Sequence, residues 1–183
     1  MLTTVERLQK AMGILGDSLE DEMLQIQIVA SSQAIENYCK RSFKLQSYTE
    51  RHSGNSRSSY INLRNYPVEN IEDVVIPGKP VGEYELLEEG RIFCPSGWPA
   101  GEHNIRVTYT AGYVLPCDAN TEKPRTLPEV LELACIFHAQ LMLRTPGVTA
   151  ERVGDISVNY SAESEGMPPT VIALISPYVG RWV

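Results

Sequence analysis

The stretch "LPEVLELACIFHAQLMLR", residues 127–144, predicts the helix around which the fold is built. A capping box opens this helix, with Thr126 as the cap, a proline in the first turn and Glu129 three residues after the cap. Apolar residues occupy most of its circumference, and one narrow polar side holds Glu129, Glu132, Gln140 and Arg144. A helix that is apolar nearly all round is buried, so we expect this segment at the centre of a helical core.

Two further helices are predicted upstream. Capping-box patterns occur at residues 3–6 (T-x-x-E) and 18–21 (S-x-x-D), and they predict helices from about Val5 to Met12 and from about Leu19 to Arg41. The second helix has acidic residues in its first turn and the basic pair Lys40-Arg41 in its last, as the helix dipole favours.

Two apolar stripes run along the second predicted helix, about 140° apart at 100° per residue. The first stripe consists of Leu19, Met23, Ile26, Ala30 and Ala34, and the second of Leu24, Ile28, Ile35 and Cys39. Two stripes require two partners. Either both are buried in a small helical bundle, or one faces the chain's own core and the other a neighbouring copy.

The hydrophobic period changes to two from Lys44 onward. Short strands are predicted at "LQSYTE", "YINLR", "EDVVI", "YELLE", "RIFC" and "NIRVTYT", with glycine- and proline-rich turns between them. In the last strand Ile105, Val107 and Tyr109 alternate with polar residues, which indicates a sheet with one solvated face. A loop of about 16 residues, 111–126, then leads back to the helix at 127–144.

These patterns predict an α+β fold in a single domain, residues 1–183. Its core is a small α-helical bundle of three main helices and a short C-terminal helix, with a β-rich insertion between the second and third helices. The expected parts are a helical core at about 3–43, 127–145 and 168–176, a β insertion at about 44–110 and a docking tail at about 168–183.

Composition narrows the possible functions. The chain is 43% hydrophobic and 21% charged, which is typical of a folded globular protein. Sixteen Lys and Arg against 23 Asp and Glu leave a formal charge of −7, which disfavours tight DNA binding through a basic face. The four widely spaced cysteines and the absence of a signal-peptide pattern predict reduced thiols in a cytoplasm. The longest apolar stretch near the end, "TVIALIS", is too short to span a membrane.

Few residues suggest chemistry. The sequence contains no phosphate-binding glycine loop, nucleophile elbow or clustered metal ligands, so we expect no catalytic residues, no metal and no cofactor. Cys135 and His138 lie three residues apart on a helix and could form half of a zinc site or a nucleophile and base; alternatively, His138 is a hydrogen-bonded core histidine. Trp98 is either a binding aromatic or a cover for the sheet edge.

The chain ends in "PYVGRWV", residues 177–183, which is unusually apolar for a terminus. Tyr178, Arg181 and Trp182 are of the residue types that dominate protein interfaces. Packing on the chain's own core and docking into another protein both account for this tail.

The order of these segments resembles the head-to-tail connector family of tailed bacteriophages, also called adaptor or head-completion proteins. The resemblance covers about residues 3–161 and lies in "LEDEMLQIQIVASSQAIENYCKRSF", "YTE", "YPVENI", "IRVTYTAGY", "LPEVLELACIFHAQLML" and "VGDISVNYS".

The resemblance implies a structural protein of the virion neck, present in the host cytoplasm during assembly. Copies of such proteins form a ring, of twelve copies, between the portal protein and a stopper or tail-completion protein. DNA passes through the channel without tight binding, and no membrane is involved. Carried onto this sequence, the portal-docking candidates are Ile172, Leu174, Ile175, Tyr178, Arg181, Trp182 and Val183, and the ring self-contact candidates are Leu24, Ile28 and Ile35.

Two alternative functions remain open at this stage. One is a small cytosolic enzyme that uses Cys135 and His138. The other is a different virion binding module, such as a tail-completion protein.

Overall fold

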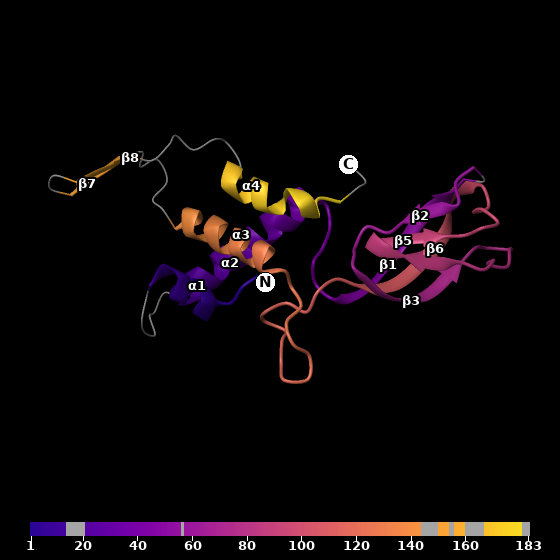
Figure 1. Ribbon diagram of the computed structural model, residues 1–183, viewed down its shortest axis with the longest axis horizontal. Helices are drawn as coiled ribbons and strands as arrows, with labels where there is room; N and C mark the ends of the chain where they lie inside the picture. Colours follow the sequence, from indigo (N-terminus) through magenta and orange to yellow (C-terminus); the bar gives the residue numbers. More distant parts are fainter. Residues whose placement is uncertain (14–20, 56, 144–149, 154–155, 160–166, 181–183) are drawn as a thin grey trace. The chain divides into compact units, whose positions relative to one another are not determined.

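A computed structural model of the chain describes residues 1–13, 21–55, 57–143, 150–153, 156–159 and 167–180 (Figure 1). The chain divides into two compact units. The helical unit comprises Met1–Cys39, Pro116–Ala119 and Leu127–Val179, and the β unit comprises Lys40–Leu115, Asn120–Thr126 and Gly180–Val183.

The helical unit contains four described α-helices: α1 (Val5–Met12), α2 (Asp21–Cys39), α3 (Glu129–Met142) and α4 (Pro169–Ile175). A 3-10 turn, η2 (Ser176–Tyr178), follows α4. The strands β7 (Ala150–Val153) and β8 (Ile156–Asn159) form a two-stranded antiparallel sheet. Helix α2 packs against α3, and α3 packs against α4, so α3 is central as predicted (Figure 1).

The helix ends correct three predictions. The cap of α1 is Thr4, whose Oγ1 accepts from the Arg7 amide at 3.4 Å, and not Thr3. Helix α2 ends at Cys39 because Lys40 adopts a left-handed conformation with φ 56°, so the basic pair 40–41 lies beyond the last turn. Pro128 precedes α3 with no side-chain cap. Thr126 instead accepts from the Val114 amide at 2.9 Å. The expected capping box at 18–21 falls largely outside the described residues.

One predicted polar position on α3 is buried. Glu132 is 1% exposed, and its carboxylate accepts from Thr3 Oγ1 at 2.9 Å and pairs with Arg7 Nε at 2.5 Å. Thr3 is therefore used as a buried donor to α3, which explains why it does not cap α1. Glu132 lies on the same side of α3 as Glu129, since Arg7 pairs with both carboxylates, but the Glu132 side chain is buried there whereas that of Glu129 is exposed.

The β unit contains two three-stranded antiparallel sheets. One has the order β1 (Gln46–Gly54), β6 (Gly101–Ala111), β3 (Val68–Val75), and the other the order β2 (Tyr60–Asn62), β5 (Arg91–Phe93), β4 (Glu85–Leu87). A short 3-10 turn, η1 (Glu88–Gly90), joins β4 to β5. Each of the six predicted strand segments overlaps one of these strands, although several bounds differ by a few residues.

The two sheets enclose a hydrophobic core of their own. Ile105, Val107 and Tyr109 are fully buried, as their alternation in β6 predicted. Trp98 is 2% exposed within the same cluster and donates from Nε1 to the Ser59 carbonyl at 3.1 Å. The interpretation of Trp98 as a structural tryptophan is thus confirmed.

The predicted architecture, a helical-bundle core with a β insertion, is wrong. The described chain has four α-helices and two three-stranded antiparallel sheets, together with the β7–β8 pair, and is mixed α+β. The error has a physical cause. The prediction places the strands as an insertion on a helical core, but the strands bury Trp98 and a cluster of aliphatic side chains between themselves and so form a core of their own.

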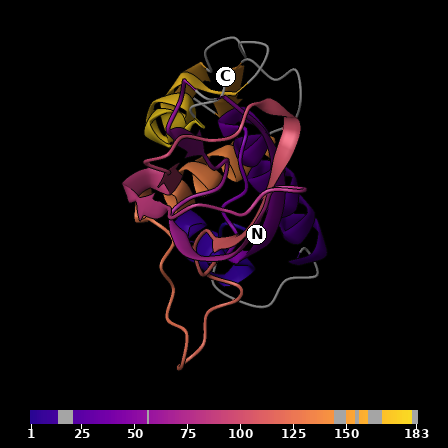
Figure 2. The same ribbon diagram turned by 90° about the vertical axis from the view of Figure 1, so that its right-hand side faces the viewer.

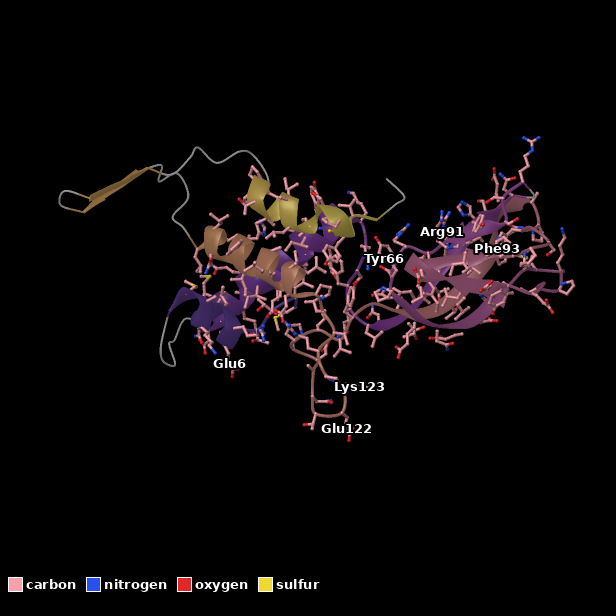
Figure 3. All side chains as sticks on the ribbon, in the orientation of Figure 1. Glu6, Tyr66, Arg91, Phe93, Glu122 and Lys123 are labelled. Carbon is pink, nitrogen blue, oxygen red and sulfur yellow. The ribbon has the colours of Figure 1, made fainter. Side chains whose placement is uncertain are left out.

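The long loop after β6 has a narrow tip (Figure 1). Its tip, with the exposed residues Glu122 and Lys123, projects in both views (Figures 1 and 2) and is labelled in Figure 3. Asn120 Oδ1 orders the tip by accepting from the amides of Glu122 at 2.9 Å and Lys123 at 2.7 Å.

Candidate functional site

The Cys135–His138 pair does not form a reactive site. Cys135 is fully buried, and burial raises the pKa of its thiol, so the thiol is protonated at neutral pH. His138 Nδ1 lies 3.1 Å from Ser31 Oγ, and the same hydroxyl donates to the Cys135 carbonyl at 3.0 Å. Burial lowers the pKa of His138, which favours its neutral form. The hydrogen-bonded histidine is confirmed, and these residues hold α2 against α3.

The part of the chain that the structure describes contains no group of three or more residues placed to hold a metal ion. Its four cysteines are free, and only Cys117 is exposed. No helix among the described residues is both long and apolar enough to cross a membrane.

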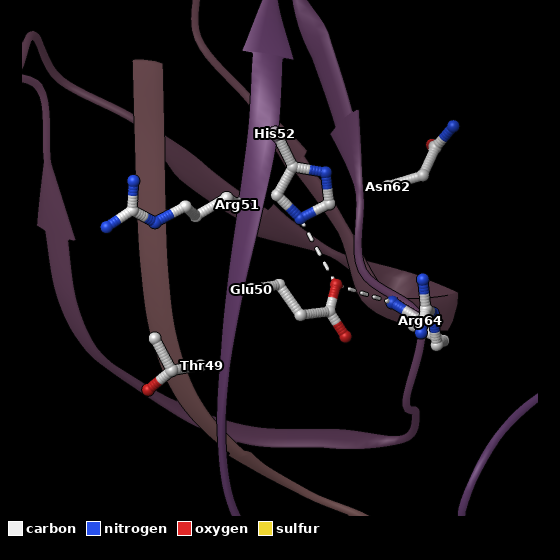
Figure 4. A pocket seen from close by; sticks show the side chains of 6 residues that line it. All are labelled: Thr49, Glu50, Arg51, His52, Asn62 and Arg64. Carbon is white, nitrogen blue, oxygen red and sulfur yellow. Dashed lines mark hydrogen bonds and ion pairs between the residues drawn. The ribbon is translucent and has the colours of Figure 1, made fainter. Parts of the chain in front are cut away.

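A surface hollow of about 410 Å³ lies beside the edge strands β1 and β2 (Figure 4). Its lining residues are Thr49, Glu50, Arg51, His52, Asn62 and Arg64. The Glu50 carboxylate accepts from the Tyr109 hydroxyl at 2.5 Å and from the Arg64 amide at 3.2 Å, and it lies 3.2 Å from His52 Nε2.

Electrostatics indicate a structural role for this hollow. Burial alone would raise the pKa of Glu50, but hydrogen bonds with His52, Tyr109 and the Arg64 amide outweigh it and lower the pKa. Burial and the adjacent Glu50 raise the pKa of Tyr109. The carboxylate is therefore ionised, and its hydrogen bonds from the Tyr109 hydroxyl and the Arg64 amide tie β1 to β6 and to the segment after β2. The i, i+2 spacing of Glu50 and His52 on one strand face was a signal for this cluster that sequence analysis missed.

The most distinctive surface feature is apolar. Ten large hydrophobic side chains are exposed among the described residues, and eight of them belong to the helical unit. Six of the eight form two stripes. The α2 stripe is Met23, Ile26 and Val29, and the α3 stripe is Val130, Leu133 and Phe137. The other two are Tyr38 and Met142.

The residues predicted for ring self-contact lie on the buried side of α2. Leu24 is 3% exposed, and Ile28 and Ile35 are fully buried within the helical unit. Met23 and Ile26, from the other predicted stripe, are 57% and 58% exposed. Sequence alone located both stripes but could not say which one α3 covers.

The predicted portal-docking residues have mixed positions. Ile175 is buried, and its carbonyl accepts from Cys39 Sγ at 3.9 Å. Ile172, Leu174 and Tyr178 are half-buried. Arg181, Trp182 and Val183 lie outside the described residues.

The net charge is distributed unequally. The sequence of the helical unit carries 4 Lys and Arg against 13 Asp and Glu, whereas that of the β unit carries 12 against 10. The acidic excess of the chain therefore belongs entirely to the helical unit. Because both stripes lie in this unit, apolar and acidic surface occur together there.

Comparison with solved structures gives three neck or virion assemblies. The chain is similar to a protein in the neck of an empty GTA particle computed with C6 symmetry, with TM-score 0.60, 18% identity and coverage of 100% of this chain and 91% of that one. It is similar to one in the neck of a native GTA particle computed with C12 symmetry, with TM-score 0.61, 18% identity and coverage of 98% and 89%. The third match, from the virion of a native gene transfer agent (GTA) particle, has TM-score 0.59, 18% identity and coverage of 100% and 91%.

At this identity the structural matches establish the fold, and among curated proteins none matches. The family model described as "Head completion protein" matches residues 1–179, nearly the whole chain. That match agrees with a structure whose surface offers apolar helix faces and whose candidate catalytic pair is buried. The chain belongs to the head completion protein family and has a structural role as a head–tail connector.

Proposed function

We propose that this connector assembles as a ring between the portal and the tail. The ring extends the DNA channel and completes the head after packaging, with a stopper or tail-completion protein on its far side. The observation that carries the proposal is the pair of exposed apolar stripes on α2 and α3, because contiguous apolar surface of this kind marks interaction sites. The similar neck assemblies, solved with C6 and C12 symmetry, support a closed ring.

The acidic helical unit fits a channel that DNA must pass without binding. A unit with 13 acidic and 4 basic residues repels the phosphate backbone over about one Debye length, roughly 10 Å at 0.1 M salt. The role assigned to the protein is accordingly structural, with no catalytic step.

The portal contact is assigned to the end of the chain beyond the buried part of α4. Val171 and Ile175 are fully buried and hold α4 in the helical unit. Ile172, Leu174 and Tyr178 retain exposed surface, and residues 181–183 add an arginine, a tryptophan and a valine. These are residue types that carry binding energy at interfaces.

Truncation tests the portal contact. A variant that ends at Val179 keeps Val171 and Ile175, so it should unfold as cooperatively as the full chain and lose binding to purified portal in sedimentation or native mass measurements. Retained portal binding would refute the assignment of residues 181–183 to the portal contact. A full chain that binds a tail protein and not the portal would instead favour the tail-completion alternative.

A further inference from the structure

The ring contact can be assigned to particular surfaces, on the basis of the proposed function. We infer that the α2 stripe of one copy packs against the α3 stripe of the next copy, so that the contact between copies is head to tail.

The two stripes lie away from the surface where α2 and α3 meet. Ser31 and Ser32 on α2 approach α3 through the Cys135 carbonyl and Sγ, at 3.0 and 3.5 Å, and His138 approaches Ser31 at 3.1 Å. At 100° per residue, the α2 stripe lies about 170° from its contact residues and the α3 stripe about 140° from its own. Two helices that pack face to face thus present their stripes on opposite flanks of the pair.

That arrangement fits one class of oligomer. A two-fold contact needs one patch that matches itself, whereas a cyclic ring of more than two copies needs two different patches on each copy that match one another. The helical unit has two apolar stripes, each with three large side chains that are between 36% and 58% exposed. In a ring of identical copies each contact therefore covers the α2 stripe of one copy and the α3 stripe of the next, so two neighbours cover both stripes of every copy.

The β unit offers no comparable pair of surfaces. Its exposed large hydrophobic side chains, among the described residues, are Tyr60 and Tyr84. Tyr60 already has partners, because the Phe93 ring lies 5.1 Å away and the Arg91 guanidinium lies 4.9 Å over its ring. Arg91, which is labelled with Phe93 in Figure 3, in turn donates from Nε to Asn62 Oδ1 at 3.2 Å. The stripes of the helical unit, by contrast, consist of aliphatic, methionine and phenylalanine side chains left facing solvent.

Acidic residues adjoin both stripes. Glu22 precedes Met23, and the exposed Glu129, which pairs with Arg7 at 3.6 Å, precedes Val130, in a unit that carries 13 acidic residues against 4 basic ones. Apolar attraction between copies is therefore opposed by like charge, which salt screens. Free copies should associate weakly at low ionic strength and more strongly as salt rises.

Paired charge insertions test the assignment. Ile26→Asp blocks the α2 stripe and Leu133→Asp blocks the α3 stripe, and both positions are exposed, so each variant should fold. On portal-bearing particles the wild type should form the neck ring, and each variant alone should fail to form it. Tyr84→Asp, at an exposed position of the β unit, is the matched control and should assemble as the wild type does.

Mixing the two variants distinguishes head-to-tail from two-fold contact. Each variant retains one intact stripe, so a mixture at high salt should give dimers of one Ile26→Asp and one Leu133→Asp chain that grow no further in sedimentation velocity. If Leu133→Asp alone loses association while Ile26→Asp does not, the contact is two-fold through α3 and the inference is overturned.

Cysteine pairs provide a second readout that detects weak contacts. All variants carry Cys117→Ser, which removes the exposed native thiol. Two mixtures are compared: Ile26→Cys with Leu133→Cys, and Met23→Cys with Phe137→Cys. Each mixture should form mixed disulfides at least several-fold faster than either variant forms disulfides alone, and faster than the Tyr84→Cys control. Equal rates for all pairs would refute the assignment.

The failure of the proposed function and the failure of the surface assignment can be told apart. Wild-type chains that never form a ring on the portal would refute the proposed function. Asp variants that form rings normally would refute only the surface assignment.

Discussion

The two units of this connector differ in how completely they bury their own apolar side chains. The β unit encloses Trp98 and the inward side chains of β6 between its sheets, and in its described part the exposed large hydrophobic side chains are two tyrosines. The helical unit is also folded around a core, yet it holds eight of the ten large hydrophobic side chains that are exposed among the described residues. A protein that assembles needs both properties: one unit that buries its apolar side chains when the chain folds, and one unit that leaves apolar surface exposed for neighbouring subunits.

The largest loss of stability is expected for a substitution in the core of the β unit. Trp98→Ala removes a fully buried indole and its hydrogen bond to Ser59, which should lower the free energy of unfolding of the β unit by about 3–5 kcal/mol. Chemical denaturation followed by circular dichroism would measure it. Tyr60→Ala is the exposed control and should cost far less. Similar losses for the two variants would mean that the β unit has no sealed core.

A buried and an exposed isoleucine on α2 test the burial pattern of the helical unit. Ile28 is fully buried and Ile26, two residues earlier, is 58% exposed. Ile28→Ala should lower the free energy of unfolding by about 2–5 kcal/mol, and Ile26→Ala by about 0.5 kcal/mol or less. Thermal and denaturant unfolding of the dilute monomer would measure both. The reverse order would show that the stripe originally assigned to ring contact is the exposed one after all.

A smaller, pH-dependent effect is expected at the Glu50 cluster. The pKa of Glu50 is lower in the folded chain than its ordinary value of 4.5, so the unfolded state binds a proton more readily. The stabilisation is therefore present above about pH 4.5 and is lost as the pH falls through the folded value. Glu50→Gln should cost about 1–3 kcal/mol at pH 7 and flatten this acid limb in unfolding curves measured from pH 3 to 7. A variant whose stability keeps the full pH dependence would place the effect elsewhere.

The smallest perturbation is chemical labelling of thiols. Cys117 is exposed, whereas Cys135 is buried and its pKa is raised by burial. A maleimide reagent at pH 7 should therefore label Cys117 rapidly and Cys135 only when the chain unfolds. Mass spectrometry of the labelled peptides would check this. Rapid labelling of Cys135 in the native chain, slowed by His138→Ala, would revive the enzyme hypothesis.

Local patterns predicted the elements well, and the errors lie where distant segments meet. The six strand segments and the bounds of α1 follow from periodicity and turn residues, which act over a few positions. Thr3 was misassigned as a cap because its partner, Glu132, lies 129 positions away. Lys40 ended α2 two residues early through a left-handed backbone conformation that no sequence rule requires of a lysine.

The candidate sites show the same difference between local patterns, which the sequence reveals, and contacts between distant segments, which it does not. The buried, unreactive setting of Cys135 and His138 agrees with the core interpretation, which required only the apolar wheel of α3. The Glu50 cluster was missed because it joins a strand, its neighbour in the sheet and a turn amide from Arg64. Such a set is visible only when the register between β1 and β6 is known.

The sequence by itself determined the order of helices and strands, the acidic balance and the existence of two apolar stripes on α2, because periodicity and composition are local properties of the chain. Only the tertiary structure decided that the β segment forms a unit with its own core, and that Leu24, Ile28 and Ile35 are covered while Met23 and Ile26 are exposed. The physical reason is that burial depends on which surface arrives from elsewhere in the chain. An amphipathic pattern specifies a face that needs a partner but does not specify the partner.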